Sequence, residues 1–329
     1  MSGYFSISRL LCIPLGMLLA TGALAQAWPG ARPITLVVGY PAGGSVDLVA
    51  RAVAQPLALR LGTPVVVENI GGASGTLGAQ KVVKAPADGY TLLLGTGSEV
   101  SIARLFNTAI RYNGETDLSP VGMIGVTPMV FLTSPKTGIH TVEDALARVR
   151  KEPNKLRFNS SGVGTPLHVA GELINLTAGI NLRHVPTNGA GQMVDDLATD
   201  KVQFSVMTLS SALPHIEAGR LVPLGLTTPA RSLTAPGVPA LAENPKLKGY
   251  DMNVWFALFG PAGLPPAIVS RLNKELNDSL RDPQTWQKLQ KAGISNEGGT
   301  PAALTAFIRS ETQRVRKVVT KAVATGSGF

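Results

Sequence analysis

The amino-acid sequence predicts an α/β protein with two lobes, each built on a mainly parallel sheet with flanking helices. Short β-branched runs alternate with segments of helical periodicity along most of the chain, which is typical of strands joined through helices. The chain also has 329 residues, whereas single hydrophobic cores usually stop growing at about 250–300 residues. Two lobes are therefore expected.

The first 25 residues indicate an export signal that is not part of the fold. Arg9 precedes an apolar run from Leu10 to Leu24, and the run ends in the small-x-small cleavage pattern Ala23-Leu24-Ala25. Because Pro14 and Gly16 interrupt this run, it is poorly suited to spanning a bilayer. We expect an exported protein cleaved near Ala25, with an N-terminal membrane anchor as the alternative.

The cysteine content and the charge exclude several classes of function. Cys12 is the one cysteine and lies in the predicted leader, so the mature chain would have no disulfide, thiol nucleophile or cysteine metal site. The formal charge is +9, and the densest basic groups lie at 148–151 and 314–317 on helix-like stretches without interleaved aromatic residues. Solvated helix faces are favoured over a nucleic-acid surface, and long-range attraction of anionic ligands is a weaker functional interpretation.

The first series of elements begins at Ile34. After the first strand, Val46, Val49, Val53 and Leu57 recur on one helical face. Because that face is apolar, the helix is expected to pack on the sheet. Strands are predicted at 34–38, 64–68 and 90–94.

A second series starts after Val126 and predicts another α/β lobe. Its first helix opens with Thr141 and Asp144, which resemble a capping box with aspartate in place of glutamate. Strands are predicted at 129–132, 156–159, 182–185 and 202–207, and helices at 141–151, 165–176, 190–199 and 211–218.

The last third of the chain is expected to return to the first lobe. From Pro229 to Pro245 the composition shifts to Pro, Ala and Thr with little periodicity, which indicates a long surface excursion. A strand at 254–259 and helices at 265–292 and 301–322 follow, with too little β pattern for a separate sheet. The predicted division is residues 26–126 and 228–329 in lobe 1 and residues 127–227 in lobe 2.

Six loops leave the carboxyl end of a predicted strand and enter a helix, which is where open α/β sheets bind ligands. None contains a charged residue, although the chain has 30 Lys and Arg and 21 Asp and Glu residues. Exposed glycine amides and helix N-termini attract anions. The loops together predict a cleft for a carboxylate, whereas an ordinary turn explains any single loop. They are GYPAGGS at 39–45, NIGGASGTLG at 69–78, GTGS at 95–98, NSSGVGT at 159–165, TNGAG at 187–191 and TLSS at 208–211.

Other chemistries have less support. Ser45 stands where a P-loop requires lysine, and Val100 stands where a dinucleotide motif requires its third glycine, so no nucleotide cofactor is expected. His168 and Glu172 are four residues apart on one helix face and, with Asp47, form candidate acid–base groups. Two such residues without a supporting cluster favour a polar helix face over a metal site. We predict no catalytic site, metal or cofactor.

The order of several segments resembles the substrate-binding receptors of tripartite tricarboxylate transporters, the Bug or TctC family of periplasmic proteins. The resemblance covers essentially the whole mature chain. Each segment alone is weak, but their order and spacing are specific. The segments are ITLVVGYPAGGSVDLVAR, LGTPVVVENIGGASGTLGAQ, PADGYTLLLGT, NSSGVGTPLHVAGE, HVPTNGAGQMVDDLATDKVQF, SALPHIEAGRLVPLGLTT and VWFALFGPAGLPPAIVSRLN.

This resemblance implies a two-lobed periplasmic binding protein, a clamshell that closes on a small carboxylate and delivers it to permease subunits in the membrane. It implies a periplasmic location and no catalytic activity, and we expect a monomer. In the family the carboxylate is held by backbone and hydroxyl donors and by bridging waters. The implied ligand contacts are Tyr40, Ala42, Gly43, Gly44, Asp47, Asn69, Gly75 and Thr76 in lobe 1, and Ser160, Ser161, Gly164, Thr165, His168, Thr187 and Thr208 in lobe 2.

Three positions depart from the family pattern. Ile70-Gly71 stands where members often carry Arg-Pro, and Thr187-Asn188 stands where they often carry Tyr-Lys. Met207-Thr208 replaces an aspartate that would pair with a ligand amino group, so we expect a carboxylic acid without a free amine. Two alternative functions remain. One is an enzyme that acts on a small carboxylic acid in the cleft with Asp47, His168 and Glu172 as acid–base groups, and the other is a ligand sensor that docks on a signalling protein.

Overall fold

The computed structural model describes residues 28–30 and 32–324. The predicted leader at residues 1–25 and its cysteine therefore lie outside the described residues. Among the helices that are described, none is long and apolar enough to cross a membrane.

The described strands form one mixed sheet, ordered β2-β1-β3-β9-β4-β7-β5-β6, with β8 and β10 also paired to β4. The pairs of β1 with β2 and β3, and of β5 with β6 and β7, are parallel. The α/β architecture is as expected and the outer strands of each half are parallel, but the sheet as a whole is mixed, because the central strands β4 and β9 run antiparallel to their neighbours. The strands are β1 (Ile34–Val38), β2 (Val65–Asn69), β3 (Thr91–Gly95), β4 (Leu118–Thr133), β5 (Arg157–Ser160), β6 (Arg183–Pro186), β7 (Phe204–Thr208), β8 (Val222–Leu226), β9 (Asn253–Pro261) and β10 (Ser295–Asn296).

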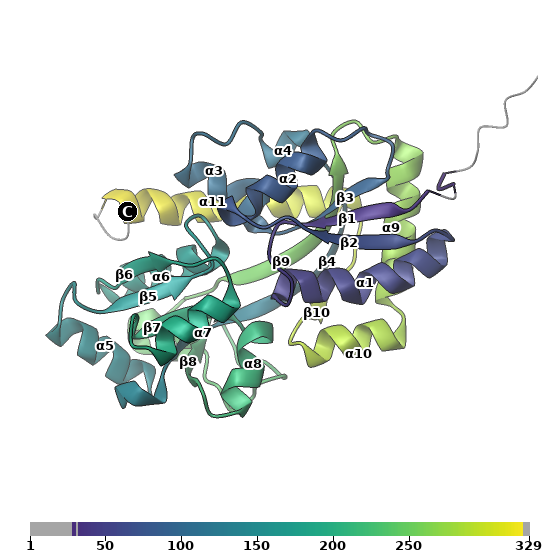
Figure 1. Ribbon diagram of the computed structural model, residues 1–329. Coiled ribbons are helices and arrows are strands. Elements are labelled where there is room, and N and C mark those ends of the chain that lie inside the picture. The colour runs from purple at the N-terminus through teal and green to yellow at the C-terminus, as the bar shows by residue number, and fades with distance from the viewer. Residues whose placement is uncertain (1–27, 31, 325–329) are drawn as a thin grey trace, which may run out of the picture.

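Strand β4 belongs to both halves of the molecule. From Leu118 to Pro128 it pairs with β9, and from Met129 to Thr133 it pairs with β7 and β8. Lobe 1 denotes the half around β1 to β3, β9 and β10, and lobe 2 the half around β5 to β8. Figure 1 shows the purple and blue elements of lobe 1 on one side and the teal elements of lobe 2 on the other, with β4 and β9 between them.

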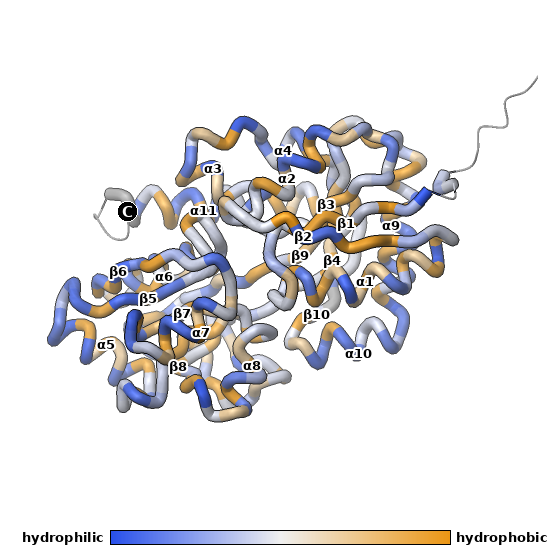
Figure 2. The backbone as a smooth tube through the Cα atoms, viewed as in Figure 1, coloured by the Kyte–Doolittle hydropathy of each residue, from blue (hydrophilic) through white to orange (hydrophobic). Residues whose placement is uncertain are grey.

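Helices cover the faces of the sheet, and apolar residues gather on the strands (Figure 2). As predicted, Val46, Val49, Val53 and Leu57 of α1 are buried, and the Thr141 hydroxyl accepts the Asp144 N–H at 3.1 Å at the start of α5. The helices are α1 (Ser45–Leu61), α2 (Thr76–Val83), α3 (Ala103–Phe106), α4 (Gly114–Asp117), α5 (Val142–Lys151), α6 (Pro166–Ala178), α7 (Ala190–Ala198), α8 (Leu209–Glu217), α9 (Pro266–Leu280), α10 (Pro283–Lys291) and α11 (Pro301–Ala324), with short helical segments η1 (Ala73–Gly75), η2 (Ser98–Ile102), η3 (Pro135–Thr137), η4 (Leu241–Glu243) and η5 (Pro245–Leu247).

The excursion after β8 packs on lobe 2. The Tyr250 hydroxyl donates to the Ala170 carbonyl of α6 at 2.6 Å, and Asn244 donates to Glu143 of α5 at 2.6 Å. Met252 N–H then donates to the Thr227 carbonyl immediately before β9. We therefore propose that the chain crosses back to lobe 1 near residue 252, with the remaining lobe boundaries as predicted from the sequence.

Candidate ligand-binding site

A cavity of about 730 Å³ lies where four helices begin, α1 from lobe 1 and α6, α7 and α8 from lobe 2. This volume is within the range of small-molecule pockets, roughly 300–1,000 Å³. No Asp, Glu, Lys or Arg lines the cavity, in agreement with the charge-free loops of the sequence. The lining comprises residues 40–46, 48, 96, 161, 165–167, 188–193, 207, 208, 210, 211, 214, 215 and 254.

The four helix starts differ in whether a side chain caps them. Thr165 Oγ1 accepts the His168 N–H at 3.2 Å at the start of α6, and Thr208 Oγ1 accepts the Ser211 N–H at 3.4 Å at the start of α8. By contrast, α1 begins after Gly44 and α7 begins after Gly189, and neither has a side-chain cap. The first amides of a helix have no acceptor within it and carry partial positive charge. One such set therefore faces the cavity from each lobe.

Asp47 lies behind the first loop and is absent from the cavity lining. Its carboxylate accepts the Gly43 N–H at 3.0 Å, the Arg51 guanidinium at 3.0 Å and the Asn69 amide at 3.0 Å. Asn69 also donates to the Tyr40 carbonyl at 3.0 Å. Asp47 and Asn69, which were expected as ligand contacts, thus hold the loop that carries Gly43.

The environment of Asp47 favours its charged form. Burial acts to raise its pKa, but hydrogen bonds from Arg51, the Gly43 N–H and Asn69 outweigh burial and lower the pKa below its ordinary value. The carboxylate is therefore ionised at neutral pH, and the loop is held by a negative charge that does not line the cavity.

Gly75 and Thr76 also lie behind the first loop. A Cβ on Gly39 would lie 2.6 Å from the Gly75 carbonyl oxygen, and a Cβ on Gly78 would lie 2.9 Å from the Gly39 Cα. Thr76 Oγ1 donates to the Ala73 carbonyl at 2.8 Å. Gly39, Gly75 and Gly78 allow the backbone of the first loop to touch the backbone around residue 75. This close approach explains the three glycines without a ligand contact.

In lobe 2, Ser160, Gly164, His168 and Thr187 form a buried support for the loop between β5 and α6. Ser160 Oγ lies 2.7 Å from His184 Nε2, Gly164 N–H donates to His168 Nδ1 at 3.3 Å, and Thr187 Oγ1 donates to the Ser160 carbonyl at 2.9 Å. None of the four lines the cavity. These contacts hold the loop that carries Ser161 and Thr165, which do line the cavity.

The groups of the enzyme alternative face the protein interior. His168 and Glu172 are 0% and 1% exposed, and neither lines the cavity. Burial raises the pKa of Glu172 to about 7, although a hydrogen bond from Asn175 acts to lower it. Burial, and then the neighbouring His168 ring, lower the pKa of His184 to about 2. Neither His168 nor Glu172 is therefore placed to contact a molecule in the cavity.

Of the remaining expected contacts, Tyr40, Ala42, Gly43, Gly44, Ser161, Thr165 and Thr208 line the cavity. The residue-level expectations missed Thr96, Asn188, Gln192, Met193 and His215, which also line it. Thr96 and Asn188 belong to strand-end loops that the sequence had indicated. Met193 and His215 lie further along their helices and carry no signal in the sequence pattern.

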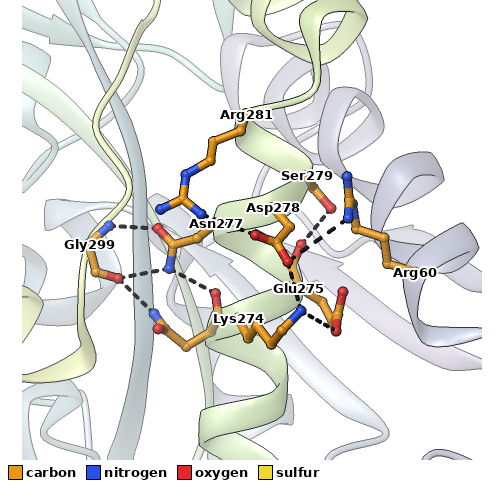
Figure 3. A network of polar contacts seen from close by, with 9 residues as sticks. Arg60, Lys274, Glu275, Asn277, Asp278, Ser279, Arg281 and Gly299 are labelled. Carbon is orange, nitrogen blue, oxygen red and sulfur yellow. Dashed lines mark hydrogen bonds and ion pairs between the residues drawn. The ribbon is translucent and has the colours of Figure 1, made fainter.

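A second cavity, of about 520 Å³, lies beside α9 in lobe 1. Figure 3 shows the polar contacts among residues of this region. Three of its charged groups pair with one another, because Asp278 accepts hydrogen bonds from Lys274 at 2.8 Å and from Arg281 at 3.1 Å. Asn277 donates to the Gly299 carbonyl at 3.0 Å and accepts the Gly299 N–H at 2.8 Å. These bonds fasten the loop before α11 to α9 and explain the cluster as a structural one. In the described part of the chain, no three His, Cys, Asp or Glu residues are placed to hold a metal.

Comparison with known proteins agrees with this geometry. Residues 49–323 match the family described as the tripartite tricarboxylate transporter family receptor. Protein BugT of Bordetella pertussis is 34% identical over 323 residues, covering 95% of this chain and 97% of that protein.

Solved structures share the fold over most of both chains. An R. palustris protein solved with adipate is 32% identical with a TM-score of 0.86, covering 90% of this chain and 98% of the other. MatC from Rhodopseudomonas palustris with bound malate is 26% identical with a TM-score of 0.82, covering 88% and 99%. The two-lobed fold, the charge-free cavity and the family match lead to one conclusion: the chain belongs to the TctC/Bug family of periplasmic solute-binding receptors for tripartite tricarboxylate transporters.

Proposed function

We propose that this protein captures a small organic carboxylate between its lobes and delivers it to a permease of the tripartite tricarboxylate type. The observation that carries the proposal is the charge-free cavity with uncapped helix starts at α1 and α7. Amides at helix N-termini hold anions without a lysine or arginine. The adipate and malate named for two structurally similar proteins support a carboxylate as the ligand.

The ligand is an acid without a free amine. The cavity lining offers no carboxylate to pair with an ammonium group. Leu48, Met193, Met207 and Val254 supply apolar wall for a carbon skeleton. A buried ammonium without an anionic partner is strongly disfavoured, so amino acids are poor ligands.

The ligand contacts fall into two groups under this proposal. The amides at residues 44–45 and 189–191, with the hydroxyl of Ser161, contact the ligand. Asp47, Asn69 and His168, with the other buried loop residues, act indirectly by holding those loops in place. The protein works as a monomer that alternates between open and closed lobes, and the ligand favours the closed form by binding it better.

Thermal unfolding of the mature protein against a panel of carboxylates tests this function. A ligand at 100 times its dissociation constant adds about 2.7 kcal/mol to the free energy of unfolding. One class of mono-, di- or tricarboxylates should raise the Tm, and aspartate and glutamate should not. Mass spectrometry of the denatured protein first checks that no acid has co-purified. A selective response to amino acids, or none to any acid in ligand-free protein, would contradict the proposal.

A proline at the start of α7 is expected to weaken ligand binding about tenfold or more. Ala190 is the first residue of α7, where proline suits the helix but removes an N–H donor. A hydrogen bond to a charged group contributes about 1.5–3 kcal/mol. Calorimetric titration of Ala190→Pro with the acid found in the panel measures the loss, and Ala190→Ser, which keeps the N–H, is the matched control. Equal affinity for both variants would remove α7 from the ligand site.

A further inference from the structure

Outside the ligand contacts, two serine hydroxyls bridge the lobes beside the cavity. Ser74 Oγ of η1 donates to the Val163 carbonyl at 2.6 Å. Ser98 Oγ of η2 lies 2.7 Å from the Ser74 carbonyl oxygen and 3.2 Å from the Gly164 carbonyl oxygen. The Ser98 hydroxyl proton is therefore shared between one acceptor in each lobe. Ser74 and Ser98 belong to lobe 1, whereas residues 163 and 164 belong to lobe 2.

The backbone on the lobe 1 side is shaped for this contact. Ala73 and Ser74 have φ values of 48° and 56°, in the left-handed region that non-glycine residues rarely adopt. Left-handed residues of this kind persist where surrounding structure holds them, and they gather at clamps and switches. Here the conformation accompanies a Ser74 hydroxyl that faces the opposite lobe and a Ser74 carbonyl that also accepts the Tyr40 hydroxyl at 3.2 Å.

The backbone on the lobe 2 side is also shaped for this contact. A Cβ on Gly162 would lie 2.9 Å from Ser74 Oγ, and a Cβ on Gly164 would lie 2.9 Å from the Ala103 Cα in α3. Glycine at both positions therefore allows the loop to approach lobe 1. The residues that flank this stretch, Ser161 and Thr165, line the cavity.

We propose that Ser74, assisted by Ser98, is a latch that stabilises the closed form of the receptor without touching the ligand. Separating the lobes at this edge breaks the Ser74–Val163 and Ser98–Gly164 bonds, so these bonds favour closure. Because Tyr40 both lines the cavity and bonds to Ser74, the latch is continuous with the ligand loop. This inference rests on the proposed function in one respect, which is that the lobes close when the ligand is captured.

Variants at position 74 separate the latch from a merely structural role. Ser74→Ala removes the donor, and Ser74→Asn supplies another donor on a residue that tolerates the left-handed conformation. Ser101→Ala is the control, because the Ser101 hydroxyl donates to the Gly97 carbonyl just before its own helical segment, η2. Each mature variant is titrated with adipate, and its radius of gyration is measured by small-angle scattering with and without adipate.

Ser74→Ala should bind adipate about threefold to tenfold more weakly than wild type, the effect of one net hydrogen bond. Its ligand-free radius of gyration should be larger, while Ser74→Asn should recover affinity. If Ser74→Ala has the same affinity and the same radius of gyration as Ser101→Ala, the latch proposal is overturned. If wild type does not bind adipate, the proposed ligand class is at fault, and the ligand-free scattering comparison decides the latch alone.

Discussion

Replacing Asp47 by alanine is expected to lower the free energy of unfolding by about 2–4 kcal/mol and to weaken ligand binding at least tenfold. The Asp47 side chain is 6% exposed and accepts bonds from Gly43, Arg51 and Asn69. Its loss leaves polar groups without partners, at roughly 1–3 kcal/mol for each buried one. It also frees the loop whose amides face the cavity, so affinity falls although Asp47 is not in the lining.

Chemical denaturation and calorimetric titration of Asp47→Ala measure the two effects. Glu68→Ala is the control, because Glu68 lies beside Asn69 in β2 but pairs with Lys81 where both side chains are more than 40% exposed. Such surface pairs contribute about 0–1 kcal/mol. A loss of stability with unchanged affinity would show that the loop holds its shape without Asp47.

The Asp47 effect has a defined pH dependence. Because the folded-state pKa is lowered, the stabilisation is present above the ordinary pKa of 3.8 and is lost as pH falls through the folded-state value. The stability difference between wild type and Asp47→Ala should stay constant from pH 5 to 8 and shrink in stronger acid.

Replacing Glu172 by glutamine is expected to stabilise the protein above neutral pH by up to about 3 kcal/mol. Burial raises the pKa of Glu172 from 4.5 to about 7, and Oε1 has no hydrogen-bond partner. A raised pKa gives stability that is fully present below 4.5 and is lost as pH rises to 7, at 1.36 kcal/mol for each pKa unit. Glutamine stays neutral and keeps an acceptor for the Asn175 amide, which donates to Glu172 at 3.2 Å.

Urea unfolding at a series of pH values from 4 to 8 checks this result. The two proteins should have similar stability near pH 4 and diverge as pH rises. Part of the wild-type slope should persist in Glu172→Gln, because burial also raises the pKa of Glu99 to about 7. Glu217→Gln, on an exposed side chain of α8, controls for the chemical change itself. Parallel curves for wild type and Glu172→Gln would show that the carboxyl is ionised in a solvated pocket.

Local patterns in the sequence predicted the elements that lie within one lobe. The apolar face of α1 and the Thr141 cap of α5 depend on residues three or four apart, so spacing alone reveals them. Strand β4 was recognised only in its second part. Its first part contains Pro120 and register shifts up to Gly125, which interrupt the alternation that marks a strand.

The sequence by itself determined the family, the alternation of strands and helices, and a cavity without charges at the strand ends. These features depend on the spacing of nearby residues and on the residue types within each single loop. Tertiary structure alone decided which loop residues face the cavity and which support it. Asp47 meets Asn69 from 22 positions away, and Ser74 meets Val163 from 89 positions away. Chain folding creates such contacts between residues whose separation leaves no periodic trace, so the sequence pattern does not reveal that Asp47 accepts a hydrogen bond from Asn69.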